Sequence, residues 1–591
     1  MAKQRKQSLL NGALILSAAI VAVKIISAFF KLYVTLKIGY DGRGYYTTAY
    51  NIYTPMYSIA LAGLPTAVSK MVSSLAAQNR FRDVKKLFGV SLTLFTLMGT
   101  VGTALILLFA YPYAKSTGAP DAQPAIIAIA PSLFFCCVMS GYRGYYQGLR
   151  NMVPSAASQT FEAAGKLIFG FILVNLVTGS GAALADKLPV LRDMSDTAHA
   201  YAAAAAISGV TIGSLMGLVY LMIRRRAAGD GITPEQLLAS PDSASARVLT
   251  RQLLTIAVPV AISSLVFNVT TLIDNWTVQN RLIYVLEKNY DAVAAMYPGI
   301  VQARGFTAET AQLFKSYLFG AYDTVLEIKN IVPTFTITLG LSAIPVISEA
   351  WTLRDMRSVR ANAESVIRLT MLLAAPAGAG MFALAGDLIY LLYGSSEVNA
   401  PAGPYIAPIL MSYGISVIFL ALAEPLTNIL QAIDRTDVPI KAIAVGGAVK
   451  LAANYIFVSI PRINIQGAVI GSILCNIVMV AYAMIVIARE TGLRYHYDTD
   501  FVRPLLCAVF SGSAASVTSS LLKKFLPESA FSSLPAVVNV RNVSTVAAIA
   551  VAVIVYLIAL FALRAVTKTE ISMLPKGEKI AKVLEKYKLL G

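Results

Sequence analysis

Long apolar runs, each about the length needed to cross a lipid bilayer, recur along the whole chain. A helix needs roughly 20 mainly apolar residues to span the hydrocarbon core, where its backbone polar groups must be bonded within the segment. The 591 residues are 57% hydrophobic and 14% charged, and the mean hydropathy is +0.67. Because a soluble fold of this length could not bury so much apolar surface, we expect an all-α integral membrane protein.

Charges, glycines and prolines divide the apolar residues into about fourteen predicted transmembrane spans. The first half gives 9–36, 45–68, 87–110, 125–147, 155–177 and 201–223. The second half gives 253–276, 318–347, 365–390, 405–429, 440–458 and 468–487, followed by an additional pair at 505–522 and 546–563. We expect the longest insertion, 280–315, to be a structured loop.

These spans predict four parts. They are an N-terminal six-helix lobe (1–223), a cytoplasmic linker (224–252), a second six-helix lobe (253–488), and a further helix pair with a basic cytoplasmic tail (489–591). Lysine and arginine concentrate in alternate loops, and positively charged short loops stay cytoplasmic. Both termini are therefore expected in the cytoplasm. The formal charge of +18 does not indicate nucleic-acid binding, because the basic residues lie in short loops between apolar segments.

Three pairs of segments repeat in the same order in the two halves. Residues 60–69 (ALAGLPTAVS) resemble 340–348 (GLSAIPVIS), and 209–214 (GVTIGS) resemble 467–472 (GAVIGS). Residues 147–166 resemble 431–450, with the same separation between a glutamine and a lysine. Each half holds an even number of predicted helices, so the repeats have parallel topology, and transporters often bind substrate between such repeats.

The stretch 31–70, KLYVTLKIGYDGRGYYTTAYNIYTPMYSIALAGLPTAVSK, and the VKKLFG that follows it at 84–89 resemble the opening of SpoVB/MurJ-type flippases. These belong to the multidrug/oligosaccharidyl-lipid/polysaccharide exporter superfamily. The resemblance implies two six-helix lobes around a central cavity, alternating access, and a groove for a lipid tail at the last two helices. It also implies a bacterial cytoplasmic membrane and flipping of an undecaprenyl-pyrophosphate-linked precursor such as lipid II.

Ionisable residues inside a membrane are costly unless they face water, a partner or a substrate. Lys24 and Lys31 lie seven residues apart on the first predicted helix and share one face. Arg43 follows in the short outer loop, beside Asp41. A pyrophosphate is the anion that matches these three cations. The alternative is that Lys31 snorkels to the interface and Arg43 pairs with Asp41.

Tyrosines recur at spacings of three and four along the second predicted helix, at Tyr46, Tyr50, Tyr53 and Tyr57. Tyr50 and Tyr53 are candidates for hydrogen bonding and stacking on a sugar, with ordinary helix packing as the alternative. Lys166 and Lys450 occupy matched positions in the repeats. Glu162 lies four residues before the first and is expected to pair with it, and Asn454 lies four residues after the second.

Several oxygen-bearing side chains are candidates for ion coupling or gating. On the seventh predicted helix these are Asn268, Thr271 and Asp274, which suit Na⁺ or a proton relay, with interface hydrogen bonding as the alternative. Asp323 and Glu327 on the eighth span, Glu424 on the tenth and Asn454 on the eleventh could make gate contacts.

An enzyme is not indicated. The chain lacks a Gly-rich phosphate loop of the Walker type, and its two histidines, His199 and His496, lie in separate loops. No metal-ligand or disulfide spacing is visible, so we expect no cofactor beyond a coupling Na⁺ or H⁺. The expected partners are a lipid-linked sugar pyrophosphate and membrane lipids, bound by a monomer.

Three alternatives stay open. One is a flippase for another lipid-linked polysaccharide unit. Another is a cation-coupled multidrug exporter, which should carry an acid where this chain carries Lys24 and Lys31. The third is a non-transporting membrane scaffold.

Overall fold

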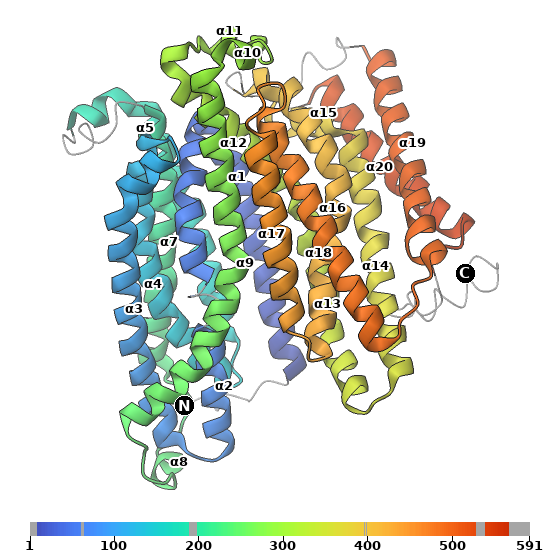
Figure 1. Ribbon diagram of the computed structural model, residues 1–591. Helices are drawn as coiled ribbons and strands as arrows, with labels where there is room; N and C mark the ends of the chain where they lie inside the picture. Colours follow the sequence, from blue (N-terminus) through green and yellow to red (C-terminus); the bar gives the residue numbers. More distant parts are fainter. Residues whose placement is uncertain are drawn as a thin grey trace. The chain divides into compact units, whose positions relative to one another are not determined.

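The computed structural model describes residues 9–58, 60, 64–187, 198–394, 396, 399–527 and 538–566. Side chains are described for these residues except 9–21, 179–187, 259–271, 273, 274, 338, 341, 342 and 345. Within these ranges the regular secondary structure is helical (Figure 1).

The helices form two compact units by their contacts. The first unit is Met1–Ile283 with Thr310–Gly320, and the second is Tyr284–Glu309 with Ala321–Gly591. The boundary falls inside α12 and leaves most of α9 in the first unit. The predicted lobe boundaries at 223 and 253 therefore stay predictions.

The helices of the first unit are α1 (Leu9–Ser58), α2 (Leu64–Ala77), α3 (Phe81–Ser116), α4 (Gln123–Gly148), α5 (Val153–Lys187), α7 (Ala198–Ala228) and α8 (Pro234–Leu238), with η2 (Pro120–Ala122). Most of α9 (Ala246–Lys288) also belongs to it. Helix α4 packs against α1, α2, α3 and α7, and α5 packs against α1 and α7. This places α4 at the centre of the unit's core.

Helix α1 contains the expected span 9–36 and most of the expected span 45–68, and it differs from the expectation only in the connection between them. It continues for 50 residues, interrupted at Gly39, where φ is 71° and ψ is 179°. Glycine adopts this conformation without a Cβ clash, so the helical path breaks there without a connecting loop. Arg43, expected in an outer loop, is therefore on α1.

The second unit begins at Tyr284, near the end of α9. Its short elements are α10 (Tyr290–Ala294), α11 (Pro298–Arg304), η3 (Ala308–Thr310), η4 (Ala400–Ala402) and η5 (Asn464–Gln466). Its long helices are α12 (Ala311–Lys329), α13 (Ile331–Thr352), α14 (Met356–Ala383), α16 (Gly403–Ala432), α17 (Asp437–Phe457), α18 (Gly467–Thr491), α19 (Arg503–Phe525) and α20 (Val540–Ala562), with the shorter α15 (Ala385–Tyr393). A π-helical turn, η6 (Asp498–Val502), precedes α19. The insertion predicted at 280–315 is structured, as expected.

Two of the expected spans in this unit are divided. The span at 318–347 is split between α12 and α13 at Asn330, and the span at 365–390 ends on α15. Helix α16 packs against α13, α14 and α18, while α19 packs against α14 and α20. The additional helix pair thus forms one side of the second unit.

Ten described helices are long and apolar enough to cross a membrane, and they correspond to ten of the fourteen predicted spans. The other four predictions fall on α1 and α2, on α9, and on α12 and α13, parts of which lie outside the described residues or side chains. The chain is therefore a multi-pass helical membrane protein, and fourteen spans stay a prediction.

The repeated segments adopt the same local geometry in both units. Arg150 and Asp434, each three residues after the matched glutamine, have φ values of 58° and 61°. Gly213 and Gly471, at matched positions in GVTIGS and GAVIGS, each pack against the preceding helix, near Lys166 and Lys450 respectively. The sequence repeat is thus also a repeat of helix packing. All four cysteines, two in each unit, are buried and unbridged.

Candidate functional site

Tyrosine rings form a continuous stripe along α1. The ring centroids of Tyr46 and Tyr50 lie 4.9 Å apart, those of Tyr50 and Tyr53 lie 6.0 Å apart, and those of Tyr53 and Tyr57 lie 5.1 Å apart. Tyr46 and Tyr53 are buried, whereas Tyr50 and Tyr57 are half-buried. The stripe therefore contains two rings that are packed in the interior and two rings that a ligand could partly reach.

Tyr53 begins a chain of hydroxyl contacts across three helices of the first unit. Its hydroxyl lies 2.9 Å from Ser132 Oγ on α4, which lies 3.0 Å from Ser214 Oγ on α7. The Cys136 thiol lies 3.5 Å from the Tyr53 hydroxyl. Because buried hydroxyls are costly without partners, these contacts fix the relative register of α1, α4 and α7.

Lys166 on α5 lies beside the stripe. Its Nζ is 5.1 Å from the Phe30 ring centroid and 5.7 Å from that of Tyr50, distances at which an ammonium is attracted to an aromatic face. Glu162 does not pair with it as expected. Its carboxylate accepts from Arg143 Nη2 of α4 at 2.8 Å, because the fixed guanidinium fork of a neighbouring helix reaches it.

Arg143 is a candidate that the sequence reasoning missed. It is only 4% exposed, and its Nε donates to Ser158 Oγ at 2.9 Å. An arginine inside the predicted span 125–147 was itself a signal for a functional or paired charge.

The two lysines predicted on the first helix and the arginine predicted in the loop after it all lie on α1, in different environments. Lys24 is exposed and Lys31 is half-buried, both before the break at Gly39. Arg43 is 1% exposed, and its guanidinium carbon lies 5.3 Å from the Tyr46 ring centroid. Lys24 and Lys31 are therefore the more accessible of the three.

A second cluster joins α1, α9 and the start of α12 within the first unit. Lys315 is fully buried, and its Nζ donates to Thr117 O at 2.8 Å and to Gln279 Oε1 at 3.0 Å. Thr48 Oγ1 also donates to Gln279 Oε1, at 3.2 Å. Lys315 precedes the predicted span at 318–347, and burial lowers the pKa of its ammonium to about 7.

Helices α1 and α12 approach closely at this cluster. A Cβ at Gly44 would overlap the carbonyl oxygen of Ser316, and one at Gly320 would overlap that of Tyr40. Glycine alone permits this backbone contact. The two glycines thus bring the backbones of α1 and the first half of α12 together.

The second unit carries a hydroxyl chain of its own. The Tyr322 hydroxyl on α12 lies 2.8 Å from that of Tyr413 on α16, which lies 3.3 Å from Ser472 Oγ on α18. Lys329 Nζ lies 4.1 Å from the Tyr413 ring centroid. Among the predicted residues, Asp323 and Asn454 are buried, while Glu327, Glu424 and Lys450 are half-buried.

Asn268 and Asp274 lie on α9, but their side chains are outside the described ones, as is that of Thr271. Their roles in ion coupling stay predictions.

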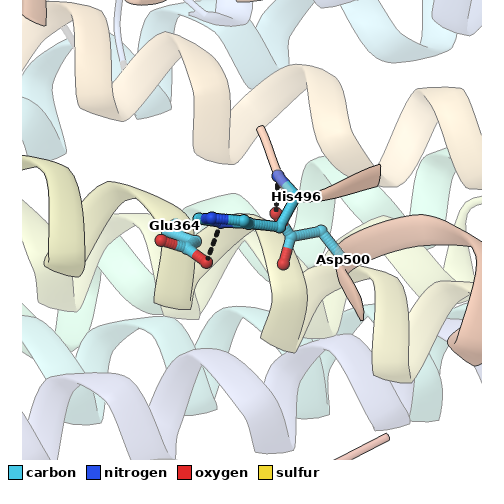
Figure 2. A group of neighbouring side chains, drawn as sticks. All are labelled: Glu364, His496 and Asp500. Carbon is cyan, nitrogen blue, oxygen red and sulfur yellow. Dashed lines mark hydrogen bonds and ion pairs between the residues drawn. The ribbon is translucent and has the colours of Figure 1, made fainter. Parts of the chain in front are cut away.

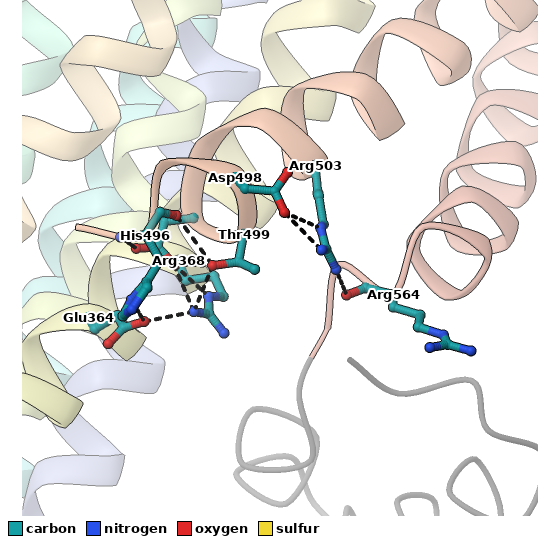
Figure 3. A network of polar contacts seen from close by, with 8 residues as sticks. Glu364, Arg368, His496, Asp498, Thr499, Arg503 and Arg564 are labelled. Atoms are coloured by element: carbon teal, nitrogen blue, oxygen red, sulfur yellow. Dashed lines mark hydrogen bonds and ion pairs between the residues drawn. The ribbon is translucent and has the colours of Figure 1, made fainter. Parts of the chain in front are cut away.

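A polar network at one end of the second unit brings together Glu364, His496 and Asp500, a set of residue types that can ligate a metal (Figure 2). His496 Nδ1 lies 3.0 Å from Glu364 Oε1. Arg368 Nη2 lies 2.8 Å from the same Glu364 oxygen (Figure 3). It also lies 2.7 Å from Asp500 Oδ1. Since the Arg368 guanidinium already forms ion pairs with both carboxylates, the geometry is that of an ion-pair network joining α14 to η6.

The network is extended at the start of α19. Arg503 Nη2 donates to Asp498 Oδ2 at 2.8 Å, and Arg503 Nη1 donates to the Arg564 carbonyl at 3.2 Å (Figure 3). These bonds tie η6 to α19 and α19 to the chain just after α20.

An apolar groove of about 470 Å³ lies between α14, α16 and α19. Small residues make up much of its lining, among them Ala375, Gly378, Ala379, Gly414, Ala508 and Gly512. Small residues let helices approach closely and leave room between their larger neighbours. The groove has the chemistry of a hydrocarbon site.

Comparison with known proteins accords with this architecture. The family described as "Polysaccharide biosynthesis protein" matches residues 9–351, and that described as "Lipid II flippase MurJ" matches residues 331–536.

Two proteins of Bacillus subtilis (strain 168) are each 24% identical to the chain. Stage V sporulation protein B matches over 514 residues, which are 86% of this chain and 89% of that protein. Lipid II flippase MurJ matches over 533 residues, which are 88% and 90%. A solved structure of lipid II flippase MurJ in an inward closed conformation aligns with a TM-score of 0.59 at 14% identity, covering 92% of this chain and 98% of that one. The chain therefore belongs to the polysaccharide biosynthesis protein family, and it is similar to flippases of the MurJ/SpoVB type.

Proposed function

We propose that the chain flips an undecaprenyl-pyrophosphate-linked cell-wall precursor, similar to lipid II, across the bacterial cytoplasmic membrane. Its membership of a flippase family supports the flipping of a lipid-linked precursor. The observation that carries the substrate class is Lys166 beside the aromatic stripe of the first unit, together with two accessible lysines on the part of α1 before Gly39. Lys166 lies against Phe30 and Tyr50, and Lys24 and Lys31 lie on the same helix as the tyrosines.

Each part of such a substrate has a chemically suitable group in one of the units. Ammonium groups on Lys24, Lys31 and Lys166 would bind the pyrophosphate, since phosphate oxygens accept charge-assisted hydrogen bonds. Tyr50 and Tyr57 are half-buried and would stack on sugar rings. The apolar groove of α14, α16 and α19 would take part of the polyprenyl tail.

The proposed mechanism is alternating access, driven by an ion gradient or by the membrane potential. Asn268 and Asp274 are proposed coupling residues, and Asp323, Glu327, Glu424, Lys450 and Asn454 are proposed gate or substrate contacts. The loops rich in lysine and arginine support an orientation with both termini in the cytoplasm.

A second substrate class is a lipid-linked polysaccharide unit other than lipid II. It is favoured by the description of the family that matches residues 9–351. Since both substrates present a pyrophosphate, sugars and a polyprenyl tail, the same residues would serve either one.

The test is rescue of cells depleted of their own lipid II flippase. The intact chain, Lys24→Ala and Lys24→Arg would be expressed at equal levels, and lipid II in the outer leaflet would be measured. We expect rescue by the intact chain and by Lys24→Arg, because each keeps a cation at this position, and at least a tenfold loss in Lys24→Ala. Lys37→Ala is the matched control, since Lys37 is an exposed lysine on the same helix.

No rescue by the intact chain would reject lipid II as the substrate and favour another lipid-linked polymer. Equal rescue by all variants would reject the role of Lys24. The same series at Lys166, with Lys166→Met and Lys166→Arg, would separate pyrophosphate binding from the contacts with Phe30 and Tyr50.

A further inference from the structure

An amphipathic cavity of about 580 Å³ lies in the first unit, between α2, the start of α9 and the chain just before α9. One part of its lining is apolar: Met71, Leu75, Val248, Leu249 and Ile256. The polar part comprises three cations and four uncharged groups: Lys70, Arg80, Arg251, Ser74, Gln78, Gln252 and Thr255. The lining includes no carboxylate.

The three cations are not equivalent. Arg80 bonds to Asp83 at 2.6 Å, and that buried carboxylate also accepts from Ala244 N at 2.7 Å. Lys70 and Arg251 are exposed and make no ion pair with any residue that the structure describes. The cavity therefore presents two uncompensated positive charges beside an apolar wall.

The position of these cations along the chain is as informative as their charge. Lys70 comes two residues after the predicted span 45–68, and Arg251 comes two residues before the predicted span 253–276. Residues that flank these predicted spans are expected at the membrane interface, the depth of lipid phosphates. Basic pockets between helices at this depth bind anionic head groups.

We propose that this cavity binds an anionic membrane phospholipid of the phosphatidylglycerol type. Lys70 and Arg251 bind the phosphodiester, Ser74 and Gln252 hydrogen-bond the glycerol hydroxyls, and the first part of an acyl chain covers Leu249 and Ile256. An occupied site joins α2 to α9 through the lipid. The site is separate from the proposed substrate contacts on Lys24, Lys31 and Lys166, so it does not rest on the proposed function.

The experiment is native mass spectrometry of the purified full-length chain, with phosphatidylglycerol or phosphatidylcholine of identical acyl chains added to delipidated protein. We expect one phosphatidylglycerol to be retained at concentrations where phosphatidylcholine is not. The double variant Lys70→Gln/Arg251→Gln should weaken this retention roughly thirtyfold, since two interfacial cations are removed.

The matched control is Lys85→Gln/Arg247→Gln, which removes two exposed cations from α3 and α9 outside the cavity lining. It should retain the lipid as the parent chain does. A second variant, Ser74→Phe, keeps both cations but fills the cavity, and it should also lose the lipid. Thermal unfolding of each variant in detergent checks that the fold is intact.

Equal retention of the two phospholipids, or unchanged retention in both cavity variants, would overturn the proposal. So would displacement of phosphatidylglycerol by an equimolar amount of undecaprenyl pyrophosphate, because the cavity would then be a substrate site. These readouts do not involve transport, so a failed rescue of lipid II flipping leaves them unaffected.

Discussion

In each of the two units a chain of hydroxyl contacts joins three helices, but the residues that form it differ. In the first unit Tyr53, Ser132 and Ser214 join three helices, and in the second Tyr322, Tyr413 and Ser472 do so. Ser214 and Ser472 are the last residues of the matched GVTIGS and GAVIGS segments. A polar contact between the sixth helix of each half and its neighbours is thus kept in both units, while the residues that complete it differ.

The charges differ more than the hydroxyls. The first unit holds the Arg143–Glu162 ion pair in its interior. When the two repeats are aligned on their matched glutamine and lysine, the corresponding residues of the second unit are Thr427 and Gly446, which carry no charge. The second repeat instead carries an exposed pair, Asp437 with Lys441, at 2.8 Å. The comparison teaches that the repeated helix packing does not depend on a particular buried charge.

Breaking the buried pair should have the largest effect. Glu162→Gln leaves the Arg143 guanidinium buried without a counter-charge, which should cost about 3–5 kcal/mol. The measurement is the unfolding midpoint in detergent, converted to an apparent free energy. Arg143→Met/Glu162→Met should recover most of the loss, because an apolar pair leaves no buried charge without a partner. A change below about 0.5 kcal/mol in the single variant would show that the arginine is solvated.

Crowding the shared helix contact should have the next largest effect. In Gly213→Val and Gly471→Val the new Cβ would overlap Glu162 O and Asn454 Oδ1, respectively. Overpacking should destabilise each variant by about 1–3 kcal/mol. Gly89→Val is the control, since nothing lies within 4 Å of the added Cβ. Loss in only one of the two variants would contradict the equivalence of the repeats.

Removing one hydroxyl group from the hydroxyl contacts of each unit should have a smaller effect. Ser214→Ala and Ser472→Ala should each cost about 1 kcal/mol, the usual net value of one hydrogen bond. The loss should be greater at Ser214, whose contact at 3.0 Å is shorter than that of Ser472 at 3.3 Å. Hydrogen exchange of α7 and α18 would measure the two effects separately. The reverse order would place the stronger contact in the second unit.

The exposed pair should matter least. Lys441→Ala should change the apparent stability by less than about 0.5 kcal/mol, because water screens the attraction between exposed charges. The matched position in the first repeat is already an alanine, Ala157. A larger loss in the thermal midpoint would mean that the second repeat depends on its surface charges.

Much of the fold was predictable because the bilayer imposes strong rules on apolar length and backbone bonding. The runs at 87–110 and 468–487, for example, appear as α3 and α18. Charges and glycines at 37–44 did indicate a break where α1 kinks at Gly39, but they did not show that the helix resumes at once without a loop. Nor could composition locate the division between α12 and α13 at Asn330, which depends on tertiary contacts.

The candidate site was less predictable, because pairing between helices depends on their rotation. Spacing along α5 suggested Glu162 as the partner of Lys166, but Arg143 of α4 takes that carboxylate. Asn454 shows the same limit. Asn454 lies four residues after Lys450, as Gly170 lies four residues after the matched Lys166. Only the structure shows that the amide oxygen of Asn454 packs against Gly471.

The burial of all four cysteines has a practical consequence for studying motion in this flippase. Thiol reagents react with accessible thiolates, so Cys136, Cys137, Cys475 and Cys507 should label slowly in the folded chain. A cysteine introduced at an exposed position would then react with the label much faster than the four native cysteines. Fluorophores or spin labels could follow each unit through a transport cycle without first removing the native thiols.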